Sequence, residues 1–475
     1  MTCYIMGIDN GSQSSKVTIY AEDGRPCAEG RVPLSATDSP RPGTVEYPDD
    51  VLWDSIAEAS RRAVAGFEGD LKEIKGIGLC TIRFCRVVLQ ANGSLAQPVM
   101  SWMDERVSRP YHRESNDAAY VTTSSGYITH RMTGNFKDTS ANYQGMWPID
   151  TDTWDWTGDE SEYEATGIPR NMLFELVQPG EELGRLTEAA ATAMNLPSGI
   201  PVIATANDKA VEALGAGLRD PSDLVISTGT YIASMAVGTD NVKKPESFWT
   251  NFASEPGLYL YESNGIRRGM WTVSWMRDLL GPEAAHTATA RGESVEQMLG
   301  REAAAVSPGS DGLLTVLDWL APVDEPYRKG SMLGFDARHG RGHMFRSILE
   351  GIAMTMKQRA DEMSEELDRG FQRIVLTGGG SSSDLLTQII ADVFGLPTVR
   401  MTGASAASRG AAICAVVGTG LAKSFDAATK QLTITADEVL PNRDNAQTYH
   451  ELGRVYRDIR AATDPLYDRT SNLFG

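Results

Sequence analysis

Residues 5–20 have the sequence IMGIDNGSQSSKVTIY, in which two short apolar runs flank a polar segment. The pattern predicts a strand, a tight turn and a second strand, in which Gly11 permits an unusual backbone angle. Hydroxyl and amide donors in such a turn suit phosphate oxygens, and a neighbouring carboxylate suits a divalent metal ion. A lone turn of this kind is more often an ordinary hairpin. The hydroxyl and amide donors here belong to Ser12, Gln13 and Ser14, and the carboxylate belongs to Asp9.

A second copy of this design favours phosphate binding. Residues 224–237 read LVISTGTYIASMAV, again a strand, a hydroxyl-rich turn with glycine, and a strand. Two such hairpins, one in each half of the chain, indicate a duplicated domain in which each copy offers one turn to a shared cleft. Neither turn is a P-loop, because the chain contains no Gly-Lys dipeptide. The second turn contributes Thr228, Gly229 and Thr230.

Length and composition limit the classes of function. A chain of 475 residues is too long for one core and predicts two domains of roughly 200 residues or more. The net charge of −19 argues against nucleic acid and against an anionic membrane as partners. Five cysteines without metal-type spacing indicate a reducing compartment. No apolar run approaches the roughly 18 residues of a membrane span, so we expect a soluble cytoplasmic protein.

Between the two hairpins, one carboxylate lies where α/β proteins gather their chemistry. A strand is predicted at 201–205 and a closely packed helix at 206–217. Asp208 therefore comes at a strand end and at a helix N-terminus. An N-cap explains an aspartate there, and it does not exclude a catalytic role, because strand ends are where such folds place active sites.

Two further segments of the first half carry candidate ligand-binding groups. Arg83 lies between two predicted strands, where it either reaches into a cleft or, more commonly, pairs with a surface carboxylate. Trp102 and Asp104 share one face of an extended segment, and an aromatic ring beside a carboxylate suits a sugar. The spacing is equally consistent with an alternative in which Trp102 packs in the core and Asp104 forms a surface pair with Arg106.

The second half contains a glycine run directly after a predicted strand. Residues 373–392 read as a strand, three glycines and an amphipathic helix, which lets a flat ligand or a phosphate approach the backbone. Helices are also expected at 269–280, 343–367 and 403–420. His339 and His343 are four residues apart, but the intervening glycines argue against a helical metal site.

Taken together, these segments resemble the FGGY family of carbohydrate kinases, within the sugar kinase, Hsp70 and actin superfamily. The resemblance covers most of the chain, and its strength lies in the order of six motifs. They are Asp9 to Lys16 and Ser227 to Thr230 for phosphate, Leu376 to Gly380 for adenosine, Gly43 to Tyr47, Trp102 to Arg106, and Asn207-Asp208.

The resemblance implies an α/β fold with two ribonuclease-H-like (actin-like ATPase) domains around a central cleft. Residues 1–219 would be mainly sugar-binding, and residues 220–475 mainly ATP-binding. The cofactors implied are ATP and Mg²⁺, with Asp9 on the metal and Asp208 as the general base. Sugar would contact Arg83, Trp102, Asp104 and Asn207. Phosphates and adenosine would contact Gly11, Ser12, Gln13, Ser14, Thr228, Gly229, Thr230, Gly269, Gly378, Gly379, Gly380 and Ser381.

Departures from the family pattern concern the sugar pocket. Xylulokinases typically have Gln-Met-His-Gly where this chain has Ile82 to Cys85. Arg83 instead matches a substrate-contacting arginine of glycerol kinases, whose following glutamate is Phe84 here. Ser405 stands where a glutamate is usual, and residues 111–127 are shorter than in typical members, either through a true deletion or because residues are missing.

General similarity is nearest to xylulokinase-like members, so we expect ATP-dependent phosphorylation of a pentulose such as D-xylulose. The alternatives are another ketose or polyol (ribulose, a glycerol-like compound or a tetritol), a nucleotide-dependent regulatory module of the actin or Hsp70 type, and a kinase relative with degraded activity. The expected partner is a small sugar or polyol, and a homodimer is one assembly that we consider.

Overall fold

The opening hairpin forms as predicted in the computed structural model, which describes residues 3–322, 325–401 and 405–474. Strands β1 (Tyr4–Asn10) and β2 (Ser14–Ala21) pair antiparallel. The Gly11 N–H donates to the Ser14 carbonyl oxygen at 3.1 Å and closes the turn. Gly11 does not use the left-handed conformation that glycine permits, because its φ is not positive.

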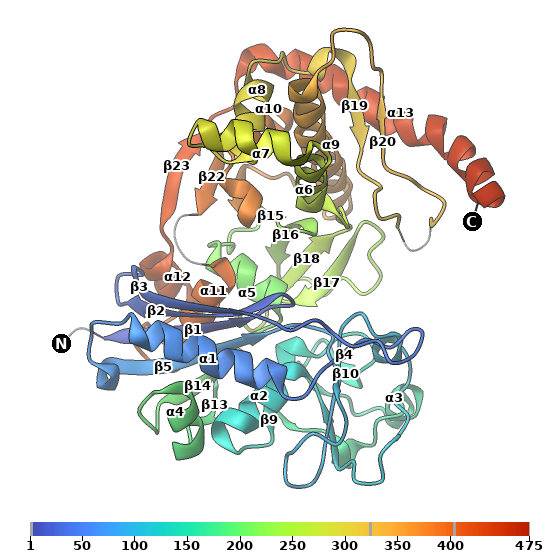
Figure 1. Cartoon of the computed structure of the whole chain (residues 1–475). Helices are drawn as coiled ribbons and strands as arrows, with labels where there is room; N and C mark the ends of the chain where they lie inside the picture. The colour runs from blue at the N-terminus through green and yellow to red at the C-terminus, as the bar shows by residue number, and fades with distance from the viewer. Residues whose placement is uncertain (1–2, 323–324, 402–404, 475) are drawn as a thin grey trace.

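The hairpin belongs to a six-stranded sheet in the first lobe (Figure 1). Its order is β13-β14-β5-β1-β2-β3, with β5 and β14 parallel to β1. Helices α1, α2 and α4 pack with the hydrophobic side of this sheet to form one core. The elements are β3 (Pro26–Pro33), α1 (Val51–Ala65), β5 (Ile74–Thr81), α2 (Ser124–Thr133), β13 (Glu182–Arg185), α4 (Glu188–Met194) and β14 (Pro201–Ala204).

A seven-stranded sheet forms the second lobe and repeats the core topology of the first. In each sheet a central strand, β1 or β15, has two antiparallel strands on one side and two parallel strands on the other. The order β18-β16-β15-β21-β22 therefore corresponds to β3-β2-β1-β5-β14. The duplication predicted from the two hairpins is therefore confirmed. The elements are β15 (Asp223–Thr228), β16 (Ile232–Gly238), β17 (Phe248–Phe252), β18 (Tyr259–Ser263), β21 (Arg373–Thr377), β22 (Thr398–Met401) and β23 (Thr435–Val439).

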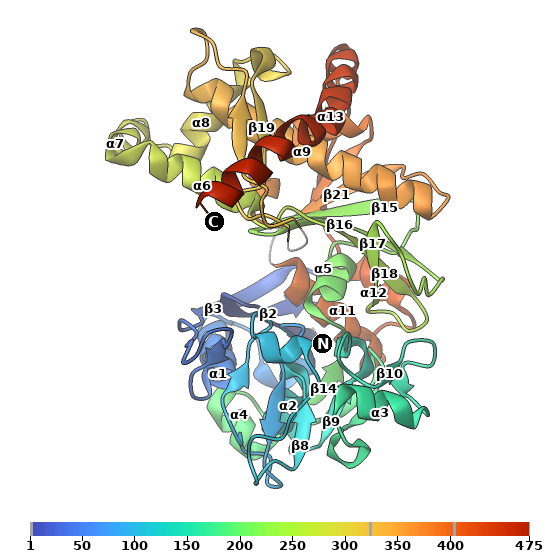
Figure 2. The ribbon, with the colours of Figure 1, turned by 90° about the vertical axis from the view of Figure 1, so that its right-hand side faces the viewer.

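Long helices surround the second sheet, and Figure 2 shows the two lobes side-on with α5 and α11 at their junction. Those helices are α6 (Gly269–Leu279), α7 (Gly281–Ala290), α8 (Val295–Ala304), α9 (Arg341–Glu366), α10 (Asp384–Phe394) and α13 (Arg443–Phe474). Shorter strands and helices complete the chain. They are β4 (Glu46–Tyr47), β6 (Val87–Leu89), β7 (Val99–Met100), β8 (Tyr120–Thr122), β9 (Lys137–Thr139), β10 (Ile149–Asp150), β11 (Asp155–Trp156), α3 (Glu160–Thr166), β12 (Glu175–Val177), β19 (Leu314–Val316) and β20 (Ser331–Leu333).

The chain returns from the second lobe to cover the other face of the first sheet. Helix α11 (Ala406–Gly418) packs on β1, β5 and α5 (Asp208–Gly215), and α12 (Phe425–Leu432) follows it. The predicted helix 403–420 thus begins at Ala406, and residues 402–404 lie outside the described residues. The Ser408 hydroxyl lies 2.9 Å from the Tyr20 hydroxyl and fastens α11 to β2.

Glycines make this contact unusually close. A Cβ atom on Gly78 would lie 1.9 Å from the Ala411 carbonyl oxygen, and one on Gly410 would lie 1.9 Å from the Val211 carbonyl oxygen. Contacts this short leave no room for a side chain. Backbone-to-backbone packing therefore requires glycine at both positions.

None of the helices in the described residues is both long and apolar enough to cross a membrane.

We predict that Gly410→Ala destabilises the protein by about 1–3 kcal/mol, because the added methyl group overpacks the α5–α11 contact. Gly300→Ala is the matched control: Gly300 also lies inside a helix, but a Cβ there would meet nothing within 4 Å. This substitution should be neutral or stabilise by up to about 1 kcal/mol, since alanine favours helix. Thermal unfolding of both variants tests the idea, and equal melting temperatures would contradict it.

Candidate functional site

A cleft of about 2430 Å³ lies between the two lobes and gathers most of the predicted site residues. Both polar turns, the glycine run and the start of α5 line it. Three predicted residues, Asp104, Asn207 and Gly269, are not among the lining residues. Those that line it are Asp9, Gly11, Ser12, Gln13, Ser14, Arg83, Trp102, Asp208, Thr228, Gly229, Thr230, Gly378, Gly379, Gly380 and Ser381.

The glycine run lies directly against the second polar turn. A Cβ on Gly378 would lie 2.8 Å from the Thr228 carbonyl carbon, and one on Gly380 would lie 2.9 Å from the Thr228 Cβ. The Thr228 hydroxyl donates to the Thr377 carbonyl oxygen. A Cβ on Gly379, in contrast, would meet nothing within 4 Å. The run therefore packs against the turn at its two ends and leaves open space beside its middle.

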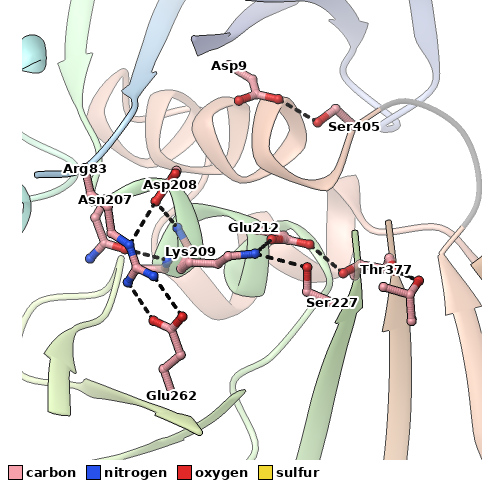
Figure 3. Close-up of polar contacts among 12 residues, drawn as sticks. Asp9, Arg83, Asn207, Asp208, Lys209, Glu212, Ser227, Glu262, Thr377 and Ser405 are labelled. Atoms are coloured by element: carbon pink, nitrogen blue, oxygen red, sulfur yellow. Dashed lines mark hydrogen bonds and ion pairs between the residues drawn. The ribbon is translucent and has the colours of Figure 1, made fainter. Parts of the chain in front are cut away.

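Asp9 presents one carboxylate at the end of β1. Its Oδ2 accepts from the Lys16 ammonium at 3.2 Å and from the Ser405 hydroxyl at 2.9 Å (Figure 3). Ser405 directly precedes α11 and Asp9 lies near the end of β1, so this contact joins the start of α11 to the end of β1. The described residues contain no group of three or more His, Cys, Asp or Glu that would hold a metal by themselves. A lone carboxylate fits Mg²⁺, which binds through one or two protein carboxylates plus water and phosphate oxygens.

The two spaced histidines hold backbone groups. His339 Nδ1 accepts from the Asp336 N–H at 2.8 Å, and His343 Nδ1 accepts from the Gly340 N–H at 3.2 Å. The His343 ring also lies 3.3 Å from an oxygen of Asp311 through its Nε2.

Asp208 is the first residue of α5, and its neighbour performs the capping. The Asn207 side-chain oxygen accepts from the Ala210 N–H at 3.1 Å, so the N-cap interpretation of Asp208 was wrong by one residue. Asp208 Oδ1 accepts from the Lys209 N–H at 2.9 Å and lies 3.6 Å from Arg83 Nε. Desolvation in the cleft raises the pKa of Asp208, while the charges of Arg83 and Lys209 oppose this shift.

Arg83 reaches across the cleft to a carboxylate of the other lobe. Its two terminal nitrogens bind Glu262, on β18, at 2.6 and 2.8 Å (Figure 3). The guanidinium also lies over the Phe84 ring, 5.1 Å from its centre. Both interpretations of Arg83 therefore hold in part: it lines the cleft and pairs with a carboxylate, which is buried. Sequence reasoning missed Glu262, whose one signal is a glutamate directly after the apolar run at 258–261.

A second polar chain joins α5 to the ends of two strands of the other lobe. The Lys209 ammonium donates to Glu212 at 2.9 Å and to the Ser227 hydroxyl at 3.1 Å. The Thr377 hydroxyl donates to the other oxygen of Glu212 at 2.6 Å. Ser227 and Thr377 precede the second polar turn and the glycine run, so this chain aligns both with α5. Lys209 and Glu212 were missed, although an acid at i and a base at i−3 on one helix face was a readable signal.

The remaining predicted residues divide between the cleft wall and its support. Trp102 lines the cleft with 47% of its surface exposed, so it is not a core residue. Asp104 is buried and accepts from the Arg106 guanidinium and from the Val45 N–H at 2.8 Å. Burial alone would raise the pKa of Asp104, but these hydrogen bonds lower it. The Gly269 N–H donates to the Thr230 carbonyl oxygen at 2.8 Å and supports the turn from behind.

Models of one protein family match both halves of the chain. The "FGGY family of carbohydrate kinases, N-terminal domain" matches residues 4–117 and 109–215, and the corresponding C-terminal domain matches residues 224–419. The two N-terminal matches overlap at residues 109–117.

Individual proteins are similar over nearly the whole chain. A protein of Escherichia coli named "Uncharacterized sugar kinase YgcE" is 45% identical over 468 residues, which cover 98% of this chain and 95% of the relative. The xylulose kinase of Lactococcus lactis is 23% identical over 507 residues, covering 98% and 97%.

Solved structures share the fold. The xylulose kinase from Rhodospirillum rubrum superposes with a TM-score of 0.82 at 21% identity, covering 98% of this chain and 100% of that structure. The glycerol kinase of Plasmodium falciparum with ADP gives a TM-score of 0.79 at 16% identity, covering 96% and 98%. The predicted fold, two actin-like ATPase domains around a cleft, is thereby confirmed.

We predict that Asp104 supports the fold. Asp104→Asn should lower the free energy of unfolding by about 1–3 kcal/mol, because the amide loses the charge-assisted hydrogen bonds to Arg106, which keeps its ion pair with Glu46. The pKa of Asp104 is lower in the folded protein than its ordinary 3.8, so the contribution is complete at neutral pH and is lost on acidification.

The matched control is Glu105→Gln, which removes an exposed ion pair with Arg109 and should cost about 0–1 kcal/mol. Denaturant unfolding at neutral pH compares the two variants. Equal losses would exclude the supporting role of Asp104.

Proposed function

The chain belongs to the FGGY family of carbohydrate kinases, and we propose that it transfers the γ-phosphoryl group of ATP to a hydroxyl of a small sugar or polyol. The observation that carries this proposal is the position of Asp208. Its carboxylate lines the same cleft as both polar turns, and its neighbour Asn207 takes over the capping of α5. A nucleotide-dependent switch has no need of a spare carboxylate at this point, so the arrangement favours a kinase.

We assign the nucleotide mainly to residues 220–475. The glycine run and the turn at Thr228 to Thr230 bring backbone N–H groups and hydroxyls to one wall of the cleft, and these groups suit phosphates and adenosine. The first turn, Gly11 to Ser14, adds hydroxyl and amide donors from the opposite wall. Mg²⁺ held near Asp9 would neutralise charge on the phosphates.

We assign the acceptor mainly to residues 1–219, beside Asp208, Arg83 and Trp102. The sugar hydroxyl would donate its proton to the Asp208 carboxylate as its oxygen bonds to the γ-phosphorus, and the bond to ADP breaks. A raised pKa makes Asp208 a better proton acceptor. Trp102 offers an aromatic face to C–H groups of the sugar. Asp104 and Asn207 act through the support of this wall.

The first acceptor to consider is a pentulose such as D-xylulose, a choice supported by the xylulose kinases among the relatives and by the general similarity along the chain. The altered segment Ile82 to Cys85 and the short segment 111–127 lie in or near the acceptor wall. These departures keep ribulose, glycerol-like compounds and tetritols as the second group of candidates.

A panel of sugars and polyols tests the proposed function. We expect one or a few small ketoses or polyols to stimulate ADP release from MgATP, measured in a coupled assay, with D-xylulose and D-ribulose included first. Each active compound should yield a phosphorylated product by mass spectrometry. Folded protein that binds MgATP and responds to no member of the panel would overturn the proposal.

We predict that Asp208→Asn lowers turnover by about 10²–10⁴-fold, the usual contribution of a positioned general base. Binding of MgATP, measured by titration calorimetry, should change little, because the amide keeps the size of the carboxylate. Asp220→Asn, at an exposed turn away from the cleft, is the control and should retain full turnover. A D208N enzyme with near-normal turnover would show that another group accepts the proton.

A further inference from the structure

The bidentate pair between Arg83 and Glu262 decides which charges remain available near the base. The pair is largely buried, with side chains 14% and 2% exposed, and bidentate charge-assisted hydrogen bonds are among the strongest in proteins. Asn251 adds a contact to Glu262 at 3.3 Å. Arg83 therefore enters the acceptor wall with both terminal nitrogens already occupied.

The other cations close to this wall are also engaged. Lys209 is held by Glu212 and the Ser227 hydroxyl. The Arg86 guanidinium donates to the carbonyl oxygens of residues 106, 107 and 109. Asp208 is the group left without a full partner, since Arg83 Nε lies 3.6 Å from it. The charges of Arg83, Lys209 and Arg86 equal in number those of Glu262, Glu212 and Asp208, and Asp208 is the carboxylate of these three without a cation within hydrogen-bond distance.

We propose that Glu262 restricts the acceptor site to uncharged sugars and polyols by occupying the guanidinium of Arg83. The inference rests on the proposed function and adds the substrate class: neutral ketoses and polyols bind, and sugar acids of the same length are rejected. Arg83 by itself would invite a carboxylate, because its planar fork matches one. Glu262 holds that place from the opposite lobe.

A sugar acid meets two obstacles here. To bind Arg83, its carboxylate must displace Glu262, which would then be buried without a counter-charge. If it does not displace Glu262, it lies beside the like charges of Glu262 and Asp208, and such juxtaposition is strongly unfavourable. A neutral hydroxyl has neither problem, because it can donate to one carboxylate and accept from Arg83 Nε. The selectivity comes from repelling the wrong ligand.

The first test uses the natural sequence and matched ligands that differ only in a terminal CH₂OH or carboxylate. The pairs are xylitol with D-xylonate, ribitol with D-ribonate, erythritol with D-erythronate, and glycerol with glycerate. Calorimetric titration in the presence of MgADP measures binding without turnover. We expect at least one neutral member to bind, and to bind roughly 100-fold or more tightly than its acid.

A sugar acid that binds within tenfold of its neutral partner would overturn the inference, as would binding by acids alone. If no neutral member binds, this inference is contradicted, whereas the proposed function is contradicted only if the ketoses of the substrate panel also yield no phosphorylated product. Neutral ligands that bind but never yield a phosphorylated product would contradict the proposed function alone.

Variants then test the part played by Glu262. In E262Q the guanidinium is released, and the affinity for the acid should rise at least tenfold relative to its neutral partner. E262D keeps the negative charge and should keep the discrimination. E255Q is the matched control, because Glu255 also pairs with an arginine, but that arginine, Arg219, does not line the cleft as Arg83 does, and E255Q should leave the ratio unchanged.

The double variant R83Q/E262Q separates charge from packing. It removes both partners, so no guanidinium is freed, and the acid should still be rejected. If E262Q alone unfolds, as judged by thermal melting, E262D, the double variant and the natural sequence still decide the question. An acid-to-neutral ratio that is the same in E262Q as in the natural sequence, with both proteins folded, would refute the role of Glu262.

Discussion

The backbone of α5 lies directly against the backbone of α11, and the position of the proposed reacting groups depends on this contact. Asp208, Lys209 and Glu212 project from the first turns of α5, so a shift of the helix would move all three together. Gly410 and Gly78 remove the side chains that would hold the elements apart. The Ser408 hydroxyl then fixes α11 to β2. Because close packing fixes the position of α5, it also fixes the position of the Asp208 carboxylate, and sites held on rigid elements are the most precisely placed.

Charge in the cleft is arranged in pairs that cross between elements. Arg83 of the first lobe binds Glu262 of the second, and Lys209 links α5 to Glu212 and to a strand end of the second lobe. Buried pairs such as these contribute little net stability, because desolvation offsets most of their attraction. Their value is geometric: each fixes a donor or a carboxylate relative to the proposed base. An anionic nucleotide bound in the cleft would therefore meet backbone N–H groups, hydroxyls and glycines beside carboxylates that are already paired.

Much of this architecture could be predicted from local patterns. The duplicated hairpins, the strand before the glycine run and the helix after Asn207 follow from apolar periodicity and turn residues, which depend on near neighbours. The errors arose where a choice depends on atoms distant in sequence. Whether Asn207 or Asp208 caps α5 is settled by side-chain direction, and whether Asp104 faces a ligand or Arg106 is settled by the loop around it. The partner of Arg83 lies 179 residues away, on a strand that joins the site only when both lobes have formed.

The return of α11 and α12 to the first sheet affects how the protein folds during its synthesis. Residues 406–432 cover a face of that sheet whose apolar side chains, Ile5, Tyr20 and Ile203 among them, form one core cluster with α11 and α12. A ribosome releases this stretch only after most of the second lobe has emerged. The first strands to be synthesised are therefore among the last to be buried on this face. The nascent chain must keep this apolar surface from aggregating for most of its synthesis.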